Sequence, residues 1–236
     1  MQNSLRPHDW AFFVAVVAVV AFVAGIFRGN LLWASASATI AFGAVLFSRR
    51  WSRKYPGPMP YAIRWLLYLS PHAPQYLKRI LRPRAGEHIL EIGPGVGHHA
   101  LVIALSLAPQ GALEVLDIQL EMLDAVARRA AAAAITNIVV KQGDAQSLPY
   151  SASIFDAAYL SGVLGEIPDQ RAALRELRRV LKPGGRLVIA EAFIDPDYIP
   201  LSKLCEDAGD AGFAFEEKLG PSFAYFARFG TLNRTT

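Results

Sequence analysis

The sequence predicts an α/β fold with a mostly parallel β-sheet, preceded by a two-helix transmembrane hairpin. Three observations support this prediction. Apolar strand patterns alternate with helical patterns along the C-terminal two thirds of the chain. A turn with glycines at positions 93, 95 and 97 follows the first of these strands. Two uncharged and mainly apolar runs, 11–27 and 31–47, come before the alternation.

The two N-terminal runs are predicted to be membrane spans. Each would form a helix roughly 25 Å long, which is within reach of a bilayer core. Residues 1–60 hold six of the 24 basic residues but one of the 20 acidic residues. Four basic residues follow the second run, against Arg28 alone between the runs. This bias predicts an inner-membrane protein with both termini and the main domain in the cytoplasm, and a lipid bilayer as partner.

Two other interpretations of the N-terminal part are open. A pair of buried core helices is one, although such helices rarely lack a polar face. A cleaved signal peptide is the other, with Ala34-Ser35-Ala36 as its cleavage site. The domain organisation predicted here is a hairpin at 1–55, a linker with lid or interfacial helices at 56–84, and the main domain at 85–236.

Composition excludes several functions for the main domain. Beyond residue 60 the chain is close to neutral, so no nucleic acid is expected as partner. The single cysteine, Cys205, excludes an internal disulfide and a cysteine-based zinc site. His98 and His99 are adjacent and would point in different directions on a helix. No metal site is therefore predicted.

The sequence predicts seven strands and five helices, of which the first helix, 75–81, lies in the segment before the main domain. The strands are expected at 88–92, 113–117, 137–141, 154–160, 186–191, 213–219 and 223–229. The helices are expected at 75–81, 100–105, 120–134, 170–181 and 201–208. Three residues separate the last two strands, which is too short for a parallel crossover, so these strands should form an antiparallel hairpin.

Acidic residues stand at the ends of the first three strands: Glu91, Asp117 and Asp144. In an open α/β sheet the carboxyl ends of the strands line the ligand crevice. A carboxylate at 117 can accept hydrogen bonds from ribose hydroxyls, and one at 144 can meet the exocyclic amine of adenine. Ile118 and Ala145 would be apolar walls for the base. These features predict an adenosine compound as ligand.

The spacing of the glycines indicates which adenosine compound binds. Dinucleotide sites use G-x-G-x-x-G, whereas this turn has a glycine at every second position. Glu91 lies just before the turn, where a carboxylate suits an ammonium or sulfonium group better than a pyrophosphate. The pattern therefore favours S-adenosylmethionine over NAD.

Five motifs carry a family resemblance: Glu91-Ile-Gly93-Pro-Gly95-Val-Gly97, Val115-Leu-Asp117, Gly143-Asp144-Ala145-Gln-Ser-Leu-Pro149, Phe155-Asp156 and Arg179-Val-Leu-Lys-Pro-Gly-Gly185. Through them residues 87–192 resemble class I S-adenosylmethionine-dependent methyltransferases. The group in question includes the ubiquinone/menaquinone-biosynthesis and phospholipid N-methyltransferases. The last two motifs are specific to this group.

The resemblance implies a fold and a set of binding residues. The fold is a Rossmann-like seven-stranded sheet of order 3-2-1-4-5-7-6 with its last strand antiparallel. The glycines of the turn would cradle the methionine part of the cofactor. Asp117 would bind ribose and Asp144 the adenine edge, while Ser161 and Gly162 would lie near the transferable methyl group.

Catalytic candidates come from the segments after the fourth and fifth strands. Gly165 stands where members of the group often have a histidine, and Glu166 is the nearest ionisable residue. Glu166 and Tyr198 are candidate bases if the acceptor must lose a proton. The predicted function is a membrane-anchored methyltransferase for a small, lipid-like acceptor, either a phospholipid amine or a quinone precursor. A non-catalytic membrane scaffold or sensor that binds S-adenosylmethionine or S-adenosylhomocysteine, and an NAD-linked oxidoreductase, are the alternatives.

Overall fold

The chain folds into two compact units, residues 1–60 and 61–236, in a computed structural model. The structure describes residues 7–29, 31–54, 73–193, 195 and 197–232, with only some of the side chains in the N-terminal helices. The segment 61–69, for which a lid or interfacial helix was predicted, lies outside the described residues, as does much of the predicted linker at 56–84.

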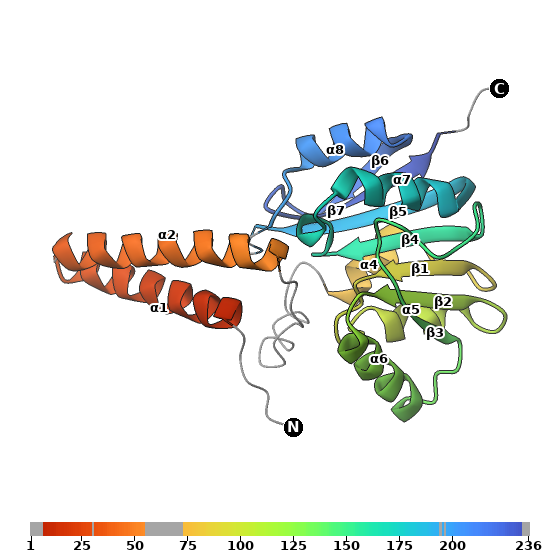
Figure 1. Ribbon diagram of the computed structural model, residues 1–236, viewed down its shortest axis with the longest axis horizontal. Helices are drawn as coiled ribbons and strands as arrows, with labels where there is room; N and C mark the ends of the chain where they lie inside the picture. Colours follow the sequence, from red (N-terminus) through yellow and green to blue (C-terminus); the bar gives the residue numbers. More distant parts are fainter. Residues whose placement is uncertain (1–6, 30, 55–72, 194, 196, 233–236) are drawn as a thin grey trace. The chain divides into compact units, whose positions relative to one another are not determined.

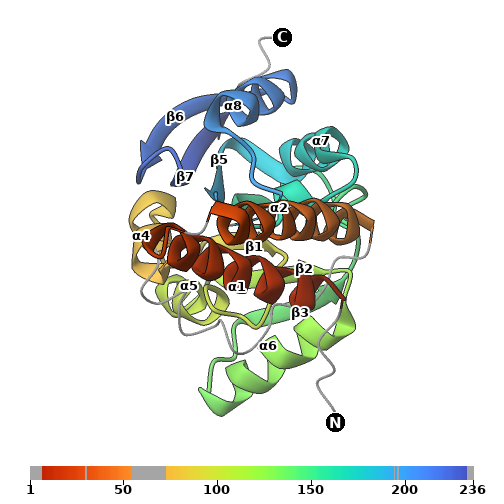
Figure 2. The same cartoon turned by 90° about the vertical axis from the view of Figure 1, so that its left-hand side faces the viewer.

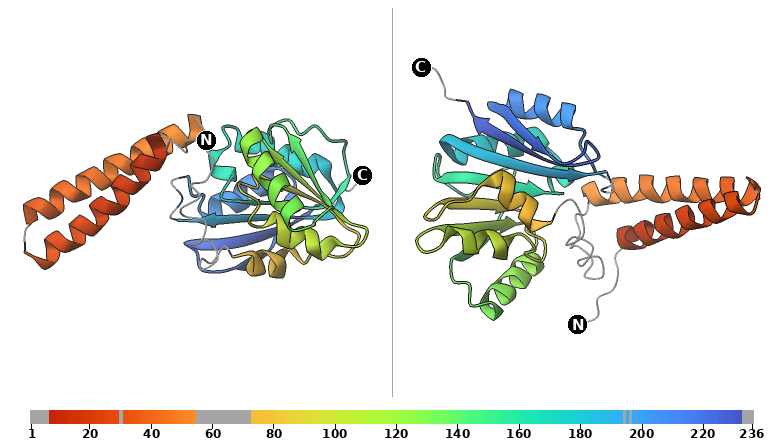
Figure 3. Two further views of the ribbon diagram at one scale, coloured as in Figure 1. Left: turned by 90° about the horizontal axis from the view of Figure 1, so that it is seen from below. Right: turned by 180° about the vertical axis from the view of Figure 1, so that it is seen from behind.

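The N-terminal unit is a hairpin of two long helices, α1 (Pro7–Phe27) and α2 (Leu31–Lys54) (Figure 1). The buried seam between them is made of small side chains, including Ala18, Ala34 and Ser37. A Cβ placed on Gly25 would lie 3.1 Å from the Ala34 backbone nitrogen, so the two backbones approach closely there. The predicted helical hairpin is thus present as a pair of packed helices (Figure 3).

The prediction that these helices are transmembrane spans is not supported. A span needs about 20 consecutive apolar residues. Within the part of the chain that the structure describes, no helix combines the length and the apolar character needed to cross a membrane. The predicted spans at 11–27 and 31–47, and the multi-pass inner-membrane localisation derived from them, therefore lack structural support.

The C-terminal unit is built on one seven-stranded sheet of order β3-β2-β1-β4-β5-β7-β6 (Figure 1), which confirms the predicted order. Figure 2 shows the same sheet turned by 90°. Its strands are β1 (His88–Ile92), β2 (Ala112–Asp117), β3 (Ile138–Gln142), β4 (Phe155–Ser161), β5 (Leu181–Ala192), β6 (Phe213–Leu219) and β7 (Ala224–Thr231). Neighbours among β1 to β5 pair in parallel. Strand β7 is antiparallel to β6, as the short turn between them predicted, and it is also antiparallel to β5.

Helices cover both faces of this sheet. They are α4 (Pro74–Leu81), α5 (Ala100–Leu107), α6 (Leu120–Ala132), α7 (Gln170–Val180) and α8 (Leu201–Asp210). Neighbouring residues of β1 face opposite cores, because side chains alternate along a strand. Ile89 packs with side chains of α4, α5 and α6. Leu90 belongs to the core that contains side chains of α7 and α8.

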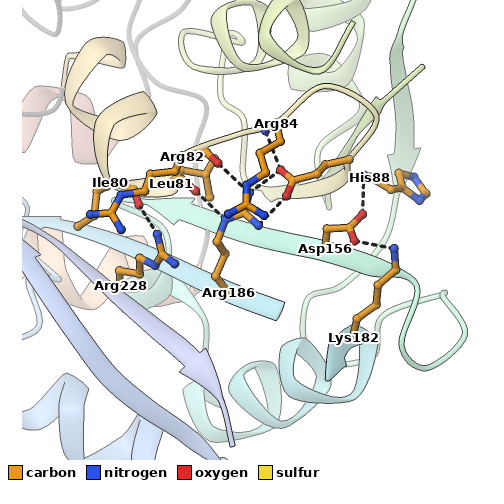
Figure 4. Close-up of polar contacts among 10 residues, drawn as sticks. Ile80, Leu81, Arg82, Arg84, His88, Asp156, Lys182, Arg186 and Arg228 are labelled. Atoms are coloured by element: carbon orange, nitrogen blue, oxygen red, sulfur yellow. Dashed lines mark hydrogen bonds and ion pairs between the residues drawn. The ribbon is translucent and has the colours of Figure 1, made fainter. Parts of the chain in front are cut away.

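Strand β5 begins earlier than the sequence predicts. Phe155 of β4 pairs with Leu181, and Ala157 pairs with Arg186. Four residues of β5, 182–185, therefore bulge out between these pairs. The Pro-Gly-Gly turn that ends α7 lies in this bulge, and Lys182 in the same bulge reaches back to Asp156 at 2.7 Å (Figure 4).

The group-specific motifs Phe155-Asp156 and Lys182-Pro-Gly-Gly185 thus have a structural role at the amino ends of the strands. The Asp156 carboxylate accepts a hydrogen bond from the backbone N–H of His88 at 2.9 Å, in addition to its ion pair with Lys182 (Figure 4). It therefore connects the starts of β1, β4 and β5. The candidate ligand residues lie at the opposite, carboxyl ends of these strands.

Candidate functional site

The turn after β1 has the shape that a ligand cradle needs. Gly93, Gly95 and Gly97 have φ values of +65°, +53° and +76°, which L side chains rarely adopt. A Cβ on Gly93 would lie 2.5 Å from a methyl carbon of Val163, in the segment after β4. The backbone therefore passes this segment at a distance that only glycine allows, and the turn leads directly to the start of α5 at Ala100.

Glu91 lies beneath the turn and is almost fully buried. It pairs in register with Tyr159 of β4, and the two side chains interact. Burial raises the pKa of the Glu91 carboxyl to about 8, hydrogen bonding with Tyr159 partly opposes this rise, and the charge of Asp117 adds to it. A cation bound beside this carboxyl would favour its ionised form.

Asp117 is the last residue of β2 and is 8% exposed. One carboxylate oxygen accepts the backbone N–H of Gln119 at 2.9 Å. Burial raises the pKa of this carboxyl, and hydrogen bonds from the backbone of residues 119 and 118 partly oppose the rise. Ile118, which follows it, is 48% exposed, so an apolar side chain stands beside the carboxylate at the strand end.

Asp144 follows β3 in a short turn and is exposed. Its carboxylate accepts the backbone N–H of Gln146 at 2.8 Å and the side-chain amide of the same residue at 2.9 and 3.0 Å. A carboxylate has about four acceptor positions, so the contacts with Gln146 leave capacity for a further donor. Ala145 beside it is buried and belongs to the core cluster that includes Leu116 and Leu148.

The segment after β4 contacts the segment after β5. Ser161 ends β4, and the backbone N–H of Gly162 donates to the Ala190 carbonyl at 2.9 Å. A Cβ on Gly162 would lie 3.4 Å from an Asp195 carboxylate oxygen. A Cβ on Gly165 would lie only 2.0 Å from the Asp197 carbonyl oxygen. The backbone of Asp197 therefore occupies the space that a side chain at position 165 would need.

Several carboxyl groups gather where these two segments meet. Glu166 lies in a short 3-10 helix, η2 (Leu164–Glu166). Burial raises the pKa of Glu166 to about 8, and the charges of Asp195, Asp197, Asp117 and Glu191 contribute to the rise. Burial also raises the pKa of Glu191 to about 8. The Glu191 carboxylate accepts the backbone N–H of Ile199 at 3.2 Å.

The two predicted catalytic side chains have different surroundings. Glu166 belongs to the group of carboxyls described above and lies close enough to Asp117 to sense its charge. The Tyr198 hydroxyl donates to the backbone carbonyl of Ser222, in the turn between β6 and β7. Burial raises the pKa of Tyr198, and the charge of Glu191 contributes to this. Tyr198 therefore ties the segment after β5 to that turn.

Two residues of this site gain their importance only in the structure. Tyr159 lies beside Glu91 because β4 is the neighbour of β1. No local sequence pattern predicts which residue of β4 lies beside Glu91. Glu191 lies near the end of β5, and its near-complete burial, which it shares with Asp197, could not be predicted from the sequence. Within the described residues, no group of three or more His, Cys, Asp or Glu side chains is arranged to hold a metal ion.

Comparison with known proteins decides the family. The model of the ubiE/COQ5 methyltransferase family matches residues 72–211, more than half of the chain. The chain belongs to this family. This membership confirms the assignment to S-adenosylmethionine-dependent methyltransferases, with S-adenosylmethionine as methyl donor.

Curated relatives match the chain over part of their length. A demethylmenaquinone methyltransferase from Symbiobacterium thermophilum is 36% identical over 110 residues, which are 46% of this chain and 44% of the relative. The ubiquinone/menaquinone biosynthesis C-methyltransferase UbiE from Coxiella burnetii is 36% identical over 121 residues, 51% of this chain and 48% of the relative. The matched region therefore spans about half the length of these relatives.

A solved structure supports the fold. A SAM-dependent methyltransferase from Aquifex aeolicus superimposes with a TM-score of 0.65 at 16% identity, over 78% of this chain and 98% of that one. At this identity the likeness concerns the fold alone.

The ubiE/COQ5-type site fits S-adenosylmethionine on its own geometry. The glycine turn admits backbone contact at Gly95, because nothing lies within 4 Å of the Cβ position there. The buried Glu91 carboxyl offers a partner for a cation, and Asp117 offers an acceptor beside an apolar side chain. These features come from the ends of β1 and β2, which are adjacent strands.

Proposed function

We propose that this chain transfers a methyl group from S-adenosylmethionine to a carbon atom of a lipid-like quinone precursor. The observation that carries the proposal is the set of carboxylates at the ends of three adjacent strands, Glu91, Asp117 and Asp144, around a cradle that only glycine can form. The choice of acceptor is supported by the two relatives, which are named for menaquinone and ubiquinone biosynthesis.

In this proposal each strand end holds one part of the cofactor. Glu91 and the glycines at 93, 95 and 97 hold the methionine part, with the carboxylate facing its ammonium group. Asp117 accepts hydrogen bonds from ribose, with Ile118 against the base. Asp144 accepts the adenine amine beside Ala145, and Ser161 lies near the methyl group. The burial of Glu91 and Asp117 supports the first two roles, because buried carboxylates bind donors strongly.

Glu166 is proposed as the base of the reaction. When bound, S-adenosylmethionine supplies an electrophilic methyl group on a sulfonium centre. Attack by a ring carbon becomes easier when a neighbouring hydroxyl of the acceptor loses its proton. The ionised form of a carboxyl with a pKa of about 8 is basic enough to take that proton, and the fraction of Glu166 in this form rises with pH up to about 8. The new carbon–carbon bond replaces the carbon–sulfur bond, whose electron pair stays on the sulfur of the leaving S-adenosylhomocysteine. The ring proton is then lost to solvent, and Glu166 releases the hydroxyl proton to solvent before the next turnover.

The N-terminal hairpin is proposed to bind a lipid bilayer. Both helices present large apolar side chains to the surroundings, among them Val17, Phe27, Leu32 and Phe42, each more than 60% exposed. Apolar surface of this extent marks an interaction site for a protein or a membrane. Flotation of the full chain with anionic liposomes tests this binding. Recovery of the chain only at the bottom of the gradient would contradict it.

Methyl-label transfer tests the proposed reaction. The full chain is incubated with methyl-labelled S-adenosylmethionine and, in parallel, with a reduced demethylated quinone that carries a prenyl tail or with phosphatidylethanolamine. We expect label on a ring carbon of the quinone and equimolar S-adenosylhomocysteine. Label on the phospholipid amine would contradict the acceptor. Cofactor binding without transfer to either compound would favour the non-catalytic scaffold.

A substitution tests the role of Glu166. Glu166→Gln removes the proton acceptor and should lower kcat by 10²-fold or more, with the affinity for S-adenosylmethionine unchanged. Glu206→Gln, on the exposed face of α8, is the matched control and should leave both quantities unchanged. Equal kcat values for Glu166→Gln and the unmodified chain would remove Glu166 from the mechanism.

A further inference from the structure

Two strongly exposed phenylalanines lie at the carboxyl end of β5 and the amino end of β7. Phe193 is 72% exposed and Phe223 is 63% exposed. The Phe193 backbone N–H donates to the Phe223 carbonyl at 2.7 Å, which continues the antiparallel pairing of Ala192 with Ala224. Residues directly opposite in an antiparallel pair present their side chains to the same face. The two rings therefore share one face of the sheet end.

Tyr198 connects these rings to the core. Its ring contacts that of Phe193 at 5.8 Å between centroids and that of buried Tyr225 at 6.2 Å. Its hydroxyl is held by the carbonyl of Ser222, the residue before Phe223. An aromatic series thus runs from the buried core at Tyr225 to the exposed ring of Phe193. We call Phe193, Tyr198 and Phe223 the aromatic ledge.

The position of the ledge in the sheet relates it to the candidate site. The residues proposed to hold the cofactor lie on β3, β2, β1 and the end of β4, and the next strands in the sheet are β5 and β7. Asp195, two residues after Phe193, has a carboxylate oxygen 3.4 Å from the Cβ position of Gly162, which follows β4. The ledge therefore begins beside the end of β4 and extends on the side away from the cofactor residues.

The chemistry of the ledge differs from that of the site beside it. Glu166, Glu191 and Asp197 provide carboxyl groups near the end of β4, whereas the ledge offers aromatic surface. An acceptor with a polar head and an apolar chain would match both parts, with the head among the carboxyls and the chain along the rings. Burying exposed aromatic surface against an apolar chain is favourable.

We propose that the aromatic ledge is the binding site for the apolar chain of the methyl acceptor and makes the enzyme prefer acceptors with a long prenyl or alkyl chain. This inference rests on the proposed function for the identity of the head group. From the site of methyl transfer, the apolar chain of the acceptor would lie over the rings of Phe193 and Phe223. The ring of Tyr198 would support the Phe193 ring from the protein side.

Kinetics with an acceptor series test the ledge. Quinols with the same ring and either no chain or a prenyl chain are compared on the full-length protein and on the variant Phe193→Ser/Phe223→Ser. We expect KM for the chain-bearing quinol to rise about tenfold, with KM for the chainless quinol and the affinity for S-adenosylmethionine unchanged. Leu105→Gln is the control, because Leu105 is 65% exposed on α5 and should leave both KM values unchanged.

Two kinetic outcomes would overturn the inference. One is an unchanged KM for the chain-bearing quinol in the double variant. The other is an equal rise in KM for both quinols, which would indicate a general disturbance of the site. The thermal unfolding midpoint and cofactor affinity of the double variant show whether it has folded.

Photo-crosslinking tests whether the aromatic ledge binds a prenyl chain, and it does not depend on methyl transfer. A prenyl chain bearing a photoreactive diazirine is irradiated with the full chain, and the modified peptides are mapped by mass spectrometry. We expect labels on the peptides that contain Phe193 and Phe223, and loss of those labels in the double variant. Crosslinks that avoid both peptides would overturn the inference. If the unmodified chain methylates no quinol but shows these crosslinks, the proposed reaction fails while the chain-binding site stands.

Discussion

Glu91 is a buried acid placed where a cation is expected to bind. Its carboxyl has a pKa of about 8 because burial disfavours the charged form, and Tyr159 offsets only part of that cost. Near neutral pH the carboxyl is therefore mainly protonated in the free protein. An ammonium group bound beside it would favour the ionised form, so binding should release a proton.

This linkage predicts how cofactor affinity depends on pH. Bound cofactor lowers the pKa of Glu91 below about 8, so affinity should rise with pH up to about 8 and level off above it, by at most tenfold per pH unit. Calorimetric titration with S-adenosylmethionine from pH 6 to pH 9 measures the slope. Glu91→Gln cannot ionise and should flatten it. A slope that is the same in both proteins would show that another group titrates.

The strand-end acids could be predicted because the relevant signals are local. Asp117 follows an apolar run, and carboxyl ends of parallel strands share one edge of the sheet, so its position follows from the strand pattern alone. Tyr159 could not be predicted as the partner of Glu91, because that contact depends on β4 pairing with β1 over a separation of 68 residues. The bond of Gln146 to Asp144 depends on side-chain geometry in a turn, which the sequence pattern does not specify.

The short helix η2 packs closely against the segment after β5 because Gly165 has no side chain. The Cβ position of Gly165 is 2.0 Å from the backbone oxygen of Asp197, so no other residue fits without moving one of the two segments. This contact explains why position 165 requires a glycine in this chain. It also brings Glu166 close to the acidic residues of the neighbouring segment.

Alanine at position 165 should therefore separate the two segments. We expect Gly165→Ala to be destabilising by about 1–3 kcal/mol and to lower kcat, since Glu166 would move with η2. Chemical denaturation and turnover measure these effects. Gly209→Ala is the matched control, because nothing lies within 4 Å of its Cβ position on α8 and alanine favours helix. It should be neutral or slightly stabilising. Equal stability of both variants would show that the contact at 165 is not tight.

Most strands and helices of the C-terminal unit could be predicted, because their apolar periodicity continues over whole elements. Strand β5 was predicted to start at residue 186, and the structure starts it at Leu181. The early start depends on the pairing of Leu181 with Phe155 across a bulge. The sequence does not predict this pairing, because a Pro-Gly-Gly turn separates Leu181 from the apolar run of the strand. In the N-terminal unit the apolar runs correctly predicted helices, but apolar content alone did not establish membrane spans.

A buried arginine connects three distant parts of the C-terminal unit. The Arg186 guanidinium of β5 donates to the carbonyls of Leu81 and Arg82 at the end of α4, and it forms a bidentate pair with Glu87 before β1 (Figure 4). Arg228 of β7 adds a bond to the Ile80 carbonyl. These contacts hold α4 against the sheet at the end opposite the candidate site.

Loss of this arginine should destabilise the whole unit. Arg186→Met leaves the Glu87 carboxylate buried without its partner, and we expect a loss of about 3–5 kcal/mol in the free energy of unfolding. Arg186→Met/Glu87→Gln should recover a large part of it. Arg82→Met is the control, because Arg82 pairs with Glu217 on the exposed surface and should cost less than about 1 kcal/mol. Equal losses in the two single variants would contradict a special role for the buried pair.

Measuring cofactor binding tests most directly whether the strand ends form an S-adenosylmethionine site. Calorimetry should show that the full chain binds S-adenosylmethionine and not NADH, and that Asp117→Ala weakens binding by at least a hundredfold. The variant removes a carboxylate proposed to accept two hydrogen bonds from ribose, each worth roughly 1.5–3 kcal/mol. Asp117→Ala with unaltered affinity for S-adenosylmethionine, or tight binding of NADH by the unmodified chain, would contradict the assignment of this site.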